Sequence, residues 1–209
     1  MKDWPIVILL GAAGSGKGTQ AALLQEQYGY EKVEAGGIVR AKAQEESEMG
    51  RKLKAISDGG GHTDDQTITG LVAEYIRSVP AEKPIVIDGY PRTQGQADLL
   101  RQLLADAGRG QQRVVAVWIN VGLKEAQRRL SQRAECQSCR AIYSSRDVKT
   151  CMKCGGIVQS RKDDNPEAIT KRLAFFVQAT MEAIEQYKAD GILAEINGEQ
   201  DVGAVFTQL

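Results

Sequence analysis

A glycine-rich stretch near the N-terminus constrains the fold of this chain more than any other feature. Residues 9–24 read LLGAAGSGKGTQAALL, with a strand-sized apolar run, Ile6–Leu10, before the glycines and a helical pattern, Lys17–Tyr28, after them. Glycine lets a backbone take positive φ angles and come close to a ligand. The glycines of this turn are Gly11, Gly14, Gly16 and Gly18.

The turn has the chemistry of a phosphate site. Backbone N–H groups in such a turn converge on one anion, and the positive N-terminal end of the following helix adds to their effect. Lys17 stands where the lysine of a P-loop belongs, although the strict pattern ends Gly-Lys-Ser/Thr and here Gly18 precedes Thr19. A structural turn with a solvated lysine is the alternative. We expect a phosphate cradle of Gly14, Ser15, Gly16, Lys17, Gly18 and Thr19.

Strands and helices alternate along most of the chain. Further buried strands are expected near residues 84–87, 114–119 and 192–196, and helices over residues 63–78, 93–107, 123–133 and 166–188. This alternation predicts an α/β fold, in which helices cover both faces of a parallel sheet. Two segments break the pattern: residues 34–61 are polar and mostly helical, and residues 134–160 carry short strands and all four cysteines.

Two of these helices have well-marked features. In the helix over residues 17–28, Ala21, Leu24 and Tyr28 share one apolar face. The helix over residues 166–188 follows a cap at Asp164 or Asn165, and Gly191 lies just beyond its end. Its core-facing stripe is Ile169, Leu173, Phe176, Thr180, Ile184 and Tyr187.

The stretch IVIDGYPRT, residues 85–93, supplies a second binding feature. Its strand ends in Asp88, which places a carboxylate at the carboxyl edge of the sheet, where such folds bind ligands. Asp88 could hold Mg²⁺ through water, because this ion keeps several of its waters. Arg92 lies over the same edge and could grip a phosphate with two hydrogen bonds. The alternatives are a carboxylate that caps the next turn and an ordinary surface arginine.

The four cysteines form two Cys-x-x-Cys pairs. Cys136 and Cys139 precede an eleven-residue loop, and Cys151 and Cys154 follow it. Because two such pairs suffice for a tetrahedral Cys₄ site, we expect a structural Zn²⁺ here. Reduced free cysteines and a redox pair are the alternatives.

Composition narrows the classes of partner and location. The chain has 27 Lys plus Arg and 27 Asp plus Glu, so no global field attracts nucleic acid or an anionic membrane. No apolar run approaches the roughly 20 residues that span a bilayer. The first apolar run lacks the flanks of a signal peptide. We therefore expect a cytoplasmic protein with neither nucleic acid nor membrane as partner.

Taken together, these motifs resemble the adenylate kinases of the bacterial long-lid type with a zinc-binding lid. The resemblance runs from about Ile6 to Ile196 and rests on GAAGSGKGTQ, DGYPRTQGQAD, RLSQR, the cysteine pairs, and RKDD followed by Arg172. It implies a three-layer P-loop fold around a five-stranded parallel sheet. The implied domains are a core of residues 1–33, 64–126 and 165–209, a nucleoside monophosphate lobe of residues 34–63, and a lid of residues 127–164. It also implies a monomer that transfers the ATP γ-phosphoryl group to AMP, giving two ADP.

The resemblance also implies roles for individual residues. Lys17, Arg133, Arg161 and Arg172 would surround the moving phosphoryl group, and Arg133 and Arg129 would also bind ATP, Arg129 against the donor adenine. The acceptor AMP would be held by Arg40, Gly89, Arg92, Gln96, Arg161 and Arg172. Asp163 and Asp164 would orient the lid arginines, and Asp88 would hold Mg²⁺ through water.

Two stretches depart from the family's pattern and keep other acceptors open. Residues 34–37 read Glu-Ala-Gly-Gly where the family commonly has Ser-Thr-Gly-Asp, and residues 59–64 read GGGHTD where it has Gly-Lys-Leu-Val-Thr-Asp. A site with fewer buried polar groups rejects a wrong base less sharply. A nucleoside monophosphate kinase that acts on UMP, CMP or GMP, or that has a relaxed choice of acceptor base, is thus one alternative. An ATP-dependent switch or a zinc-ribbon nucleic-acid binder is an alternative from another class, favoured by the excess of Lys and Arg over residues 133–164.

Overall fold

The core of the molecule is a parallel sheet of five strands. A computed structural model describes residues 4–209, and its main sheet has the order β2-β3-β1-β4-β8 with every pair parallel. The strands are β1 (Ile6–Leu10), β2 (Glu31–Glu34), β3 (Ile85–Asp88), β4 (Val114–Asn120) and β8 (Leu193–Asn197). Parallel strands need crossover connections, and the helices between them supply these. The predicted α/β class and five-stranded sheet are confirmed.

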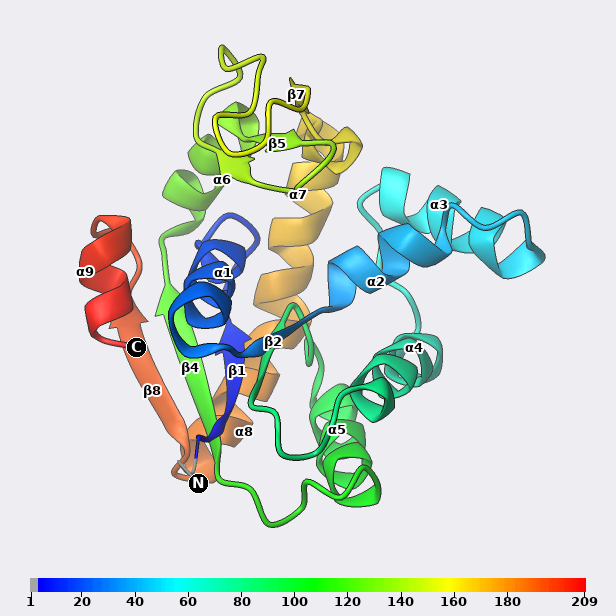
Figure 1. Cartoon of the computed structure of the whole chain (residues 1–209), viewed down its shortest axis with the longest axis vertical. Helices are drawn as coiled ribbons and strands as arrows, with labels where there is room; N and C mark the ends of the chain where they lie inside the picture. The colour runs from blue at the N-terminus through cyan, green and yellow to red at the C-terminus, as the bar shows by residue number, and fades with distance from the viewer. Residues whose placement is uncertain (1–3) are drawn as a thin grey trace.

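Helices pack on both faces of the sheet, as alternate strand residues require (Figure 1). Ile6, Ile8 and Leu10 belong to one apolar cluster, whereas Val7 and Leu9 belong to another. The first cluster is closed by α4 (Asp65–Ser78), α5 (Gln94–Asp106), α6 (Leu123–Gln132), α7 (Pro166–Phe175) and α8 (Met181–Ala189). The second cluster is closed by α1 (Lys17–Tyr28) and α9 (Val202–Thr207). The result is three layers.

Two excursions of the chain rise beyond the carboxyl ends of the strands (Figure 1). The first carries α2 (Ala35–Lys42) and α3 (Glu48–Asp58), in agreement with the helical insert expected there. The second forms a small antiparallel sheet of β5 (Ala134–Cys136), β6 (Ile142–Tyr143) and β7 (Val158–Gln159), followed by the 3₁₀ turn η1 (Lys162–Asp164). The domain limits implied by the family remain a prediction.

The structure changes two expectations about helices. The single helix expected over residues 166–188 contains a π-helical segment, η2 (Phe176–Thr180), between α7 and α8. Asn165 caps α7 by accepting from the N–H of Ala168 at 2.9 Å. Tyr28 was expected on the buried face of α1 but is 47% exposed, and its ring stacks with that of Phe206 at 6.1 Å. It lies in the last turn of α1, where the helix meets α9 instead of the sheet.

Among the helices of residues 4–209, none combines the length and apolarity needed to cross a membrane.

Candidate active site

The glycine-rich turn wraps the start of α1. Gly11, Gly14 and Gly16 have φ angles of 139°, 86° and 101°, a region that other residues rarely adopt. Gly18 does not share this conformation, because it lies inside α1. Its requirement is space: a Cβ at Gly18 would stand 3.2 Å from Asp88 Oδ2. The turn therefore needs glycine for two reasons: the positive φ angles at Gly11, Gly14 and Gly16, and the close approach of Asp88 at Gly18.

Lys17 folds back over this turn. Its Nζ donates to the carbonyl oxygens of Gly11 and Ala12, both at 2.7 Å, and lies 3.3 Å from Ser15 Oγ. Burial lowers the pKa of Lys17 to about 8, although the Asp88 carboxylate opposes this and nearby arginines reinforce it. The amine therefore sits where an arriving phosphate would both pair with it and favour its charged form.

Four predicted arginines line one cavity with the turn: Arg92, Arg133, Arg161 and Arg172. The last three of them share two aspartates. Arg133 makes a bidentate pair with Asp164, through Nε at 2.8 Å and Nη2 at 2.7 Å. Arg172 Nη1 reaches the same carboxylate at 3.0 Å. Arg161 makes a second bidentate pair, with Asp163, at 2.9 and 2.8 Å. Burial alone would raise the pKa of Asp163, but Arg161 and Arg172 hold it well below its usual range. Both aspartates thus hold guanidinium groups in place, and their expected role in orienting the lid arginines in the closed form stays a prediction.

Arg40 and Arg92 lie on the side of α2. Arg40 Nη2 contacts Glu34 Oε1 at 2.6 Å, and Lys32 contacts Glu34 Oε2 at 2.8 Å. Burial opposes ionisation of Glu34, yet these cations lower its pKa to about 2. Arg92 Nε donates to the carbonyl oxygen of Gly89 at 2.8 Å. Both arginines line the same two cavities, Arg40 from α2 and Arg92 from the chain that follows β3.

Both polar atoms of the Gln96 side chain are already bonded within the protein. Its Oε1 accepts from the N–H of Arg92 at 2.7 Å, and its Nε2 donates to Asp65 Oδ1 at 2.7 Å. Asp65 Oδ2 also accepts from the hydroxyl of Thr93 at 2.8 Å. Gln96 thus anchors the chain that carries Arg92.

One large cavity, of about 1130 Å³, joins most of these groups. It extends from the glycine-rich turn to the lid, and it includes all four converging arginines, Arg40, Arg129 and Asp88. Its volume exceeds that of a typical single-ligand pocket, which holds roughly 300–1,000 Å³. Arg129 Nε pairs with Glu125 at 2.8 Å along one wall. Gln96 instead borders a smaller cavity of about 90 Å³ that adjoins the large one at Arg92.

Three residues of this region escaped the sequence reasoning. His62 and Phe175 stack with ring centroids 3.5 Å apart, and Glu34 forms the pair with Arg40 described above. All three line the large cavity. Glu34 and His62 were marked only by the departures from the family's pattern at residues 34–37 and 59–64, which do not indicate what replaces the missing groups, and Phe175 carried no signal.

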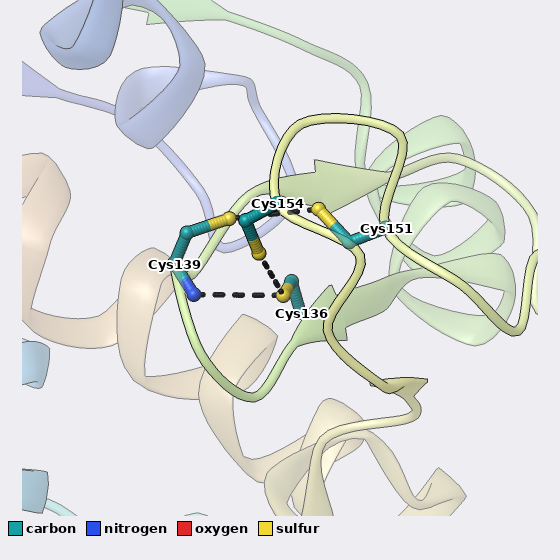
Figure 2. A group of neighbouring side chains, drawn as sticks. All are labelled: Cys136, Cys139, Cys151 and Cys154. Carbon is teal, nitrogen blue, oxygen red and sulfur yellow. Dashed lines mark hydrogen bonds between the residues drawn. The ribbon is translucent and has the colours of Figure 1, made fainter.

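The sulfur atoms of the four cysteines converge on one another within the lid (Figure 2). Their sulfur atoms are all within 4.8 Å of one another, and two pairs, Cys136 with Cys154 and Cys139 with Cys151, are 3.5 Å apart. Four sulfurs bound to one Zn²⁺ at about 2.3 Å would stand about 3.8 Å apart, so the cluster fits this ion. Tyr143 Oη also donates to Cys151 Sγ at 3.2 Å. The sequence prediction that the four thiols come together agrees with the structure.

Comparison with known sequences places the chain in a family. The sequence profile described as adenylate kinase matches residues 9–192. A protein named adenylate kinase from Syntrophotalea carbinolica is 36% identical over 208 residues, which cover 97% of this chain and 95% of that protein. The chain belongs to the adenylate kinase family. An adenylate kinase from Nitrosococcus oceani is 38% identical over 202 residues, covering 93% and 92% of the two chains. The adenylate kinase resemblance read from the motifs is thereby confirmed.

Proposed function

We propose that this protein catalyses the reversible transfer of the γ-phosphoryl group from MgATP to AMP, which gives two ADP. Membership of the adenylate kinase family supports this reaction. The observation that carries it is the set of positive side chains that line one cavity, namely Lys17, Arg92, Arg133, Arg161 and Arg172. Phosphoryl transfer needs such positioning and charge stabilisation, and little covalent chemistry from the protein.

The two ends of the cavity suggest where each nucleotide binds. We assign the donor phosphates to the turn of Gly14 to Thr19, with Arg129 against the donor base and Arg133 over the phosphates. We assign the acceptor to the side of α2, where Arg40 and Arg92 hold its phosphate with Gly89, and Arg161 and Arg172 reach it from the lid and from α7. Gln96 lies at the acceptor end through its bond to Arg92. Closure of the lid would exclude water and prevent hydrolysis of ATP.

We assign two metals to this enzyme. Mg²⁺, bound with ATP, would be held through water by Asp88, whose carboxylate lies beside Gly18 at the start of α1. The ion neutralises phosphate charge when bound. Zn²⁺ would be held by Cys136, Cys139, Cys151 and Cys154 and would stabilise a lid too small to build its own core.

The residues around the acceptor side support a second candidate for the acceptor base. Residues 34–37 lack the polar groups common in the family, and Glu34 now pairs with Arg40. A kinase that also accepts GMP, CMP or UMP is therefore the second candidate. The protein acts as a monomer on free nucleotides in this proposal, without nucleic acid.

The test is production of nucleoside diphosphate from MgATP with AMP, GMP, CMP or UMP in turn, at matched concentrations. A strong preference for AMP supports the first candidate, and comparable use of another monophosphate supports the second. Lys17→Met should lower kcat/KM by roughly 10³-fold or more, because it removes a charge from the transferred phosphoryl group. Lys188→Met, at an exposed position in α8, is the matched control. Full turnover by Lys17→Met would refute the mechanism.

The zinc proposal has its own measurement. Elemental analysis of the purified protein should find one zinc per chain, and Cys151→Ser should lower both the metal content and the thermal midpoint. Stoichiometric zinc in the Cys151→Ser variant would contradict a four-cysteine site.

A further inference from the structure

Arg92 differs from the other arginines of the cavity in what holds it. Arg40, Arg133, Arg161 and Arg172 each form an ion pair with a carboxylate. Over residues 4–209, Arg92 forms none; its partners are the carbonyl oxygen of Gly89, at 2.8 Å, and His62 Nδ1, 3.4 Å from Arg92 Nη1. Both partners are uncharged, so the positive charge of Arg92 is not neutralised by direct pairing.

His62 is fixed by close packing. Gly60 takes a φ of 67°, and a Cβ there would stand only 2.7 Å from Ala168 Cα, so this segment crosses α7 at short range. The His62 ring then stacks on Phe175, the last residue of α7, with an angle of 19° between the ring planes. A ring held on one face by another ring has little freedom to turn away from Arg92.

The contact with Arg92 also determines where the His62 proton lies. A guanidinium can only donate, so Nδ1 must accept and the proton of the neutral ring is on Nε2. Burial, with Arg92 and Arg172, lowers the pKa of His62 to about 3, so the ring is neutral near pH 7. A neutral acceptor can orient a guanidinium without cancelling its charge. An arriving anion therefore meets Arg92 without first displacing a carboxylate.

The position of His62 connects this contact to the acceptor side of the cavity. The ring borders both the large cavity and the smaller one of about 90 Å³, and Arg40 and Arg92 border both as well. Residues 34–37 of the same side have lost the polar groups common in the family, and Arg40 is engaged by Glu34. Arg92 is thus the guanidinium on this side that remains available without exchange of a carboxylate.

We propose that His62, stacked on Phe175, is a positioning residue that directs Arg92 at the phosphate of the acceptor nucleoside monophosphate and thereby sets acceptor affinity. The inference rests on the proposed function, since it assigns the acceptor phosphate to Arg92. In this role His62 acts through Arg92 and does not need to touch the nucleotide.

Three variants test this role: His62→Leu, His62→Gln and His62→Glu. For each, kcat and the KM values for AMP and for ATP are measured at constant ionic strength, and AMP binding is measured by calorimetry without ATP. His62→Leu should raise KM for AMP roughly tenfold, the loss expected for one hydrogen bond to a charged group. KM for ATP should stay within about twofold of the wild type, because donor binding does not use Arg92.

The comparison of His62→Gln with His62→Glu makes the test specific. His62→Gln keeps an uncharged acceptor oxygen and should recover most of the loss seen in His62→Leu. His62→Glu has the same size but adds a carboxylate, and should raise KM for AMP roughly tenfold above His62→Gln because it pairs with Arg92 and competes with the phosphate. Since these two variants differ only in charge, their comparison holds even where His62→Leu folds poorly. Thermal midpoints of all variants monitor the fold.

Several results would overturn the inference. These are an unchanged KM for AMP in His62→Leu, equal values for His62→Gln and His62→Glu, or a parallel rise in KM for AMP and ATP, which would indicate a general structural defect. Failure of the proposed function is distinguishable, because it would appear in the wild type as no ADP from ATP plus AMP.

Discussion

Lys17 combines a charge to which the proposed mechanism assigns a role with an environment that opposes that charge. Burial lowers its pKa from 10.5 to about 8, and Asp88 offsets this only in part. Lysine carries its charge below its pKa, so the free enzyme begins to lose the positive group at the glycine-rich turn above about pH 8. The same pKa shift affects the free energy of unfolding. Between pH 8 and 10.5 the unfolded chain binds more protons at Lys17 than the folded chain does, so Lys17 makes the free energy of unfolding rise with pH in that window.

We therefore expect kcat/KM for MgATP to fall about tenfold per pH unit above about pH 8, without loss of the fold. A pH–rate profile with saturating AMP measures the decline, and the thermal midpoint at each pH checks the fold. A profile that stays flat to pH 10 would contradict the assignment of Lys17 to the phosphates.

Arg109 is a second buried cation, with a purely structural setting. It is only 1% exposed, and its guanidinium donates to four backbone carbonyls that follow α4, those of Val79, Pro80, Ala81 and Lys83. It ties together the connection between α4 and β3, which is neither helix nor strand itself.

Replacing Arg109 with Ala should lower the free energy of unfolding by about 3 kcal/mol, because several buried carbonyls lose their donor at once. Urea unfolding measures this, and Arg113→Ala, at an exposed position nearby, should change stability by less than about 0.5 kcal/mol. Equal stability of the two variants would show that water replaces the guanidinium. Turnover at low temperature should be unchanged in both.

The residues of this chain differ in how far the local sequence predicts their contacts. Lys17, Asp88, Arg92 and the cysteines stand at fixed spacings inside local motifs, so their placement followed from the sequence. The contacts of Arg109 and the stack of His62 on Phe175 join residues far apart in the chain. No periodic pattern marks such contacts, because they depend on how whole elements pack.

At the scale of elements, the π-helical segment η2 interrupts the long helix that is formed by α7 and α8. The residues of the predicted apolar stripe, from Ile169 to Tyr187, are all buried, yet the stripe spans α7, η2 and α8. A π segment adds one residue to a turn and rotates the helix beyond it. In η2 this brings the hydroxyl of Thr180 to the carbonyl oxygen of Arg92, at 3.0 Å. Spacings of three and four residues fit both helix types, so the sequence could not reveal the segment.

Deleting Val177, which is half exposed in η2, tests this arrangement. Removing one residue from η2 should make the segment α-helical and leave Ile184 and Tyr187 in place, because a π segment holds one residue more in its turn than an α-helix does. We expect the free energy of unfolding to fall by less than about 1 kcal/mol and kcat/KM to be retained. Val177→Ala, measured in the same urea titration, should stay within about 0.5 kcal/mol of the wild type. A loss of several kcal/mol in the deletion variant would mean that η2 does not accommodate a single added residue.

At the scale of the whole molecule, basic side chains hold an acidic group ionised at the end of β2, where the first excursion begins, and another within the second excursion. Glu34 has its pKa lowered to about 2 by Lys32 and Arg40 against the effect of burial, and Asp163 is lowered by Arg161 and Arg172. A carboxylate whose pKa is lower in the folded state stabilises that state above its unfolded value, near 4.5 for Glu34. This contribution is lost as the pH falls through about 2.

Stability should therefore decline progressively below about pH 4.5. The Glu34 contribution is at most about 3 kcal/mol at neutral pH, from its shift of the pKa. Urea unfolding between pH 7 and pH 2.5 measures the decline, which should be shallower in Glu34→Gln than in the wild type. Glu185→Gln, an exposed change on α8, should keep the wild-type slope. Identical slopes in all three proteins would contradict the role of Glu34.

The global architecture was predictable because it rests on alternation. Buried runs such as Ile6–Leu10 and Val114–Asn120 separated by amphipathic helices allow few arrangements besides a covered parallel sheet. The strand Glu31–Glu34 gave no such signal, since only Val33 is fully buried in it. It is an edge strand that pairs with β3 alone, and the family resemblance supplied what its short polar sequence could not.

The way the two excursions leave the sheet has a consequence for how such enzymes diversify. The first leaves after β2 and returns through α4 to β3, which is the neighbour of β2 in the sheet. The second leaves after α6 and returns to α7, which packs against α6. Each is a detour with adjacent ends, so its length and composition can change over generations while the strand order stays the same. Either excursion can thus be remodelled on its own, while the sheet and the glycine-rich turn at its edge keep their arrangement.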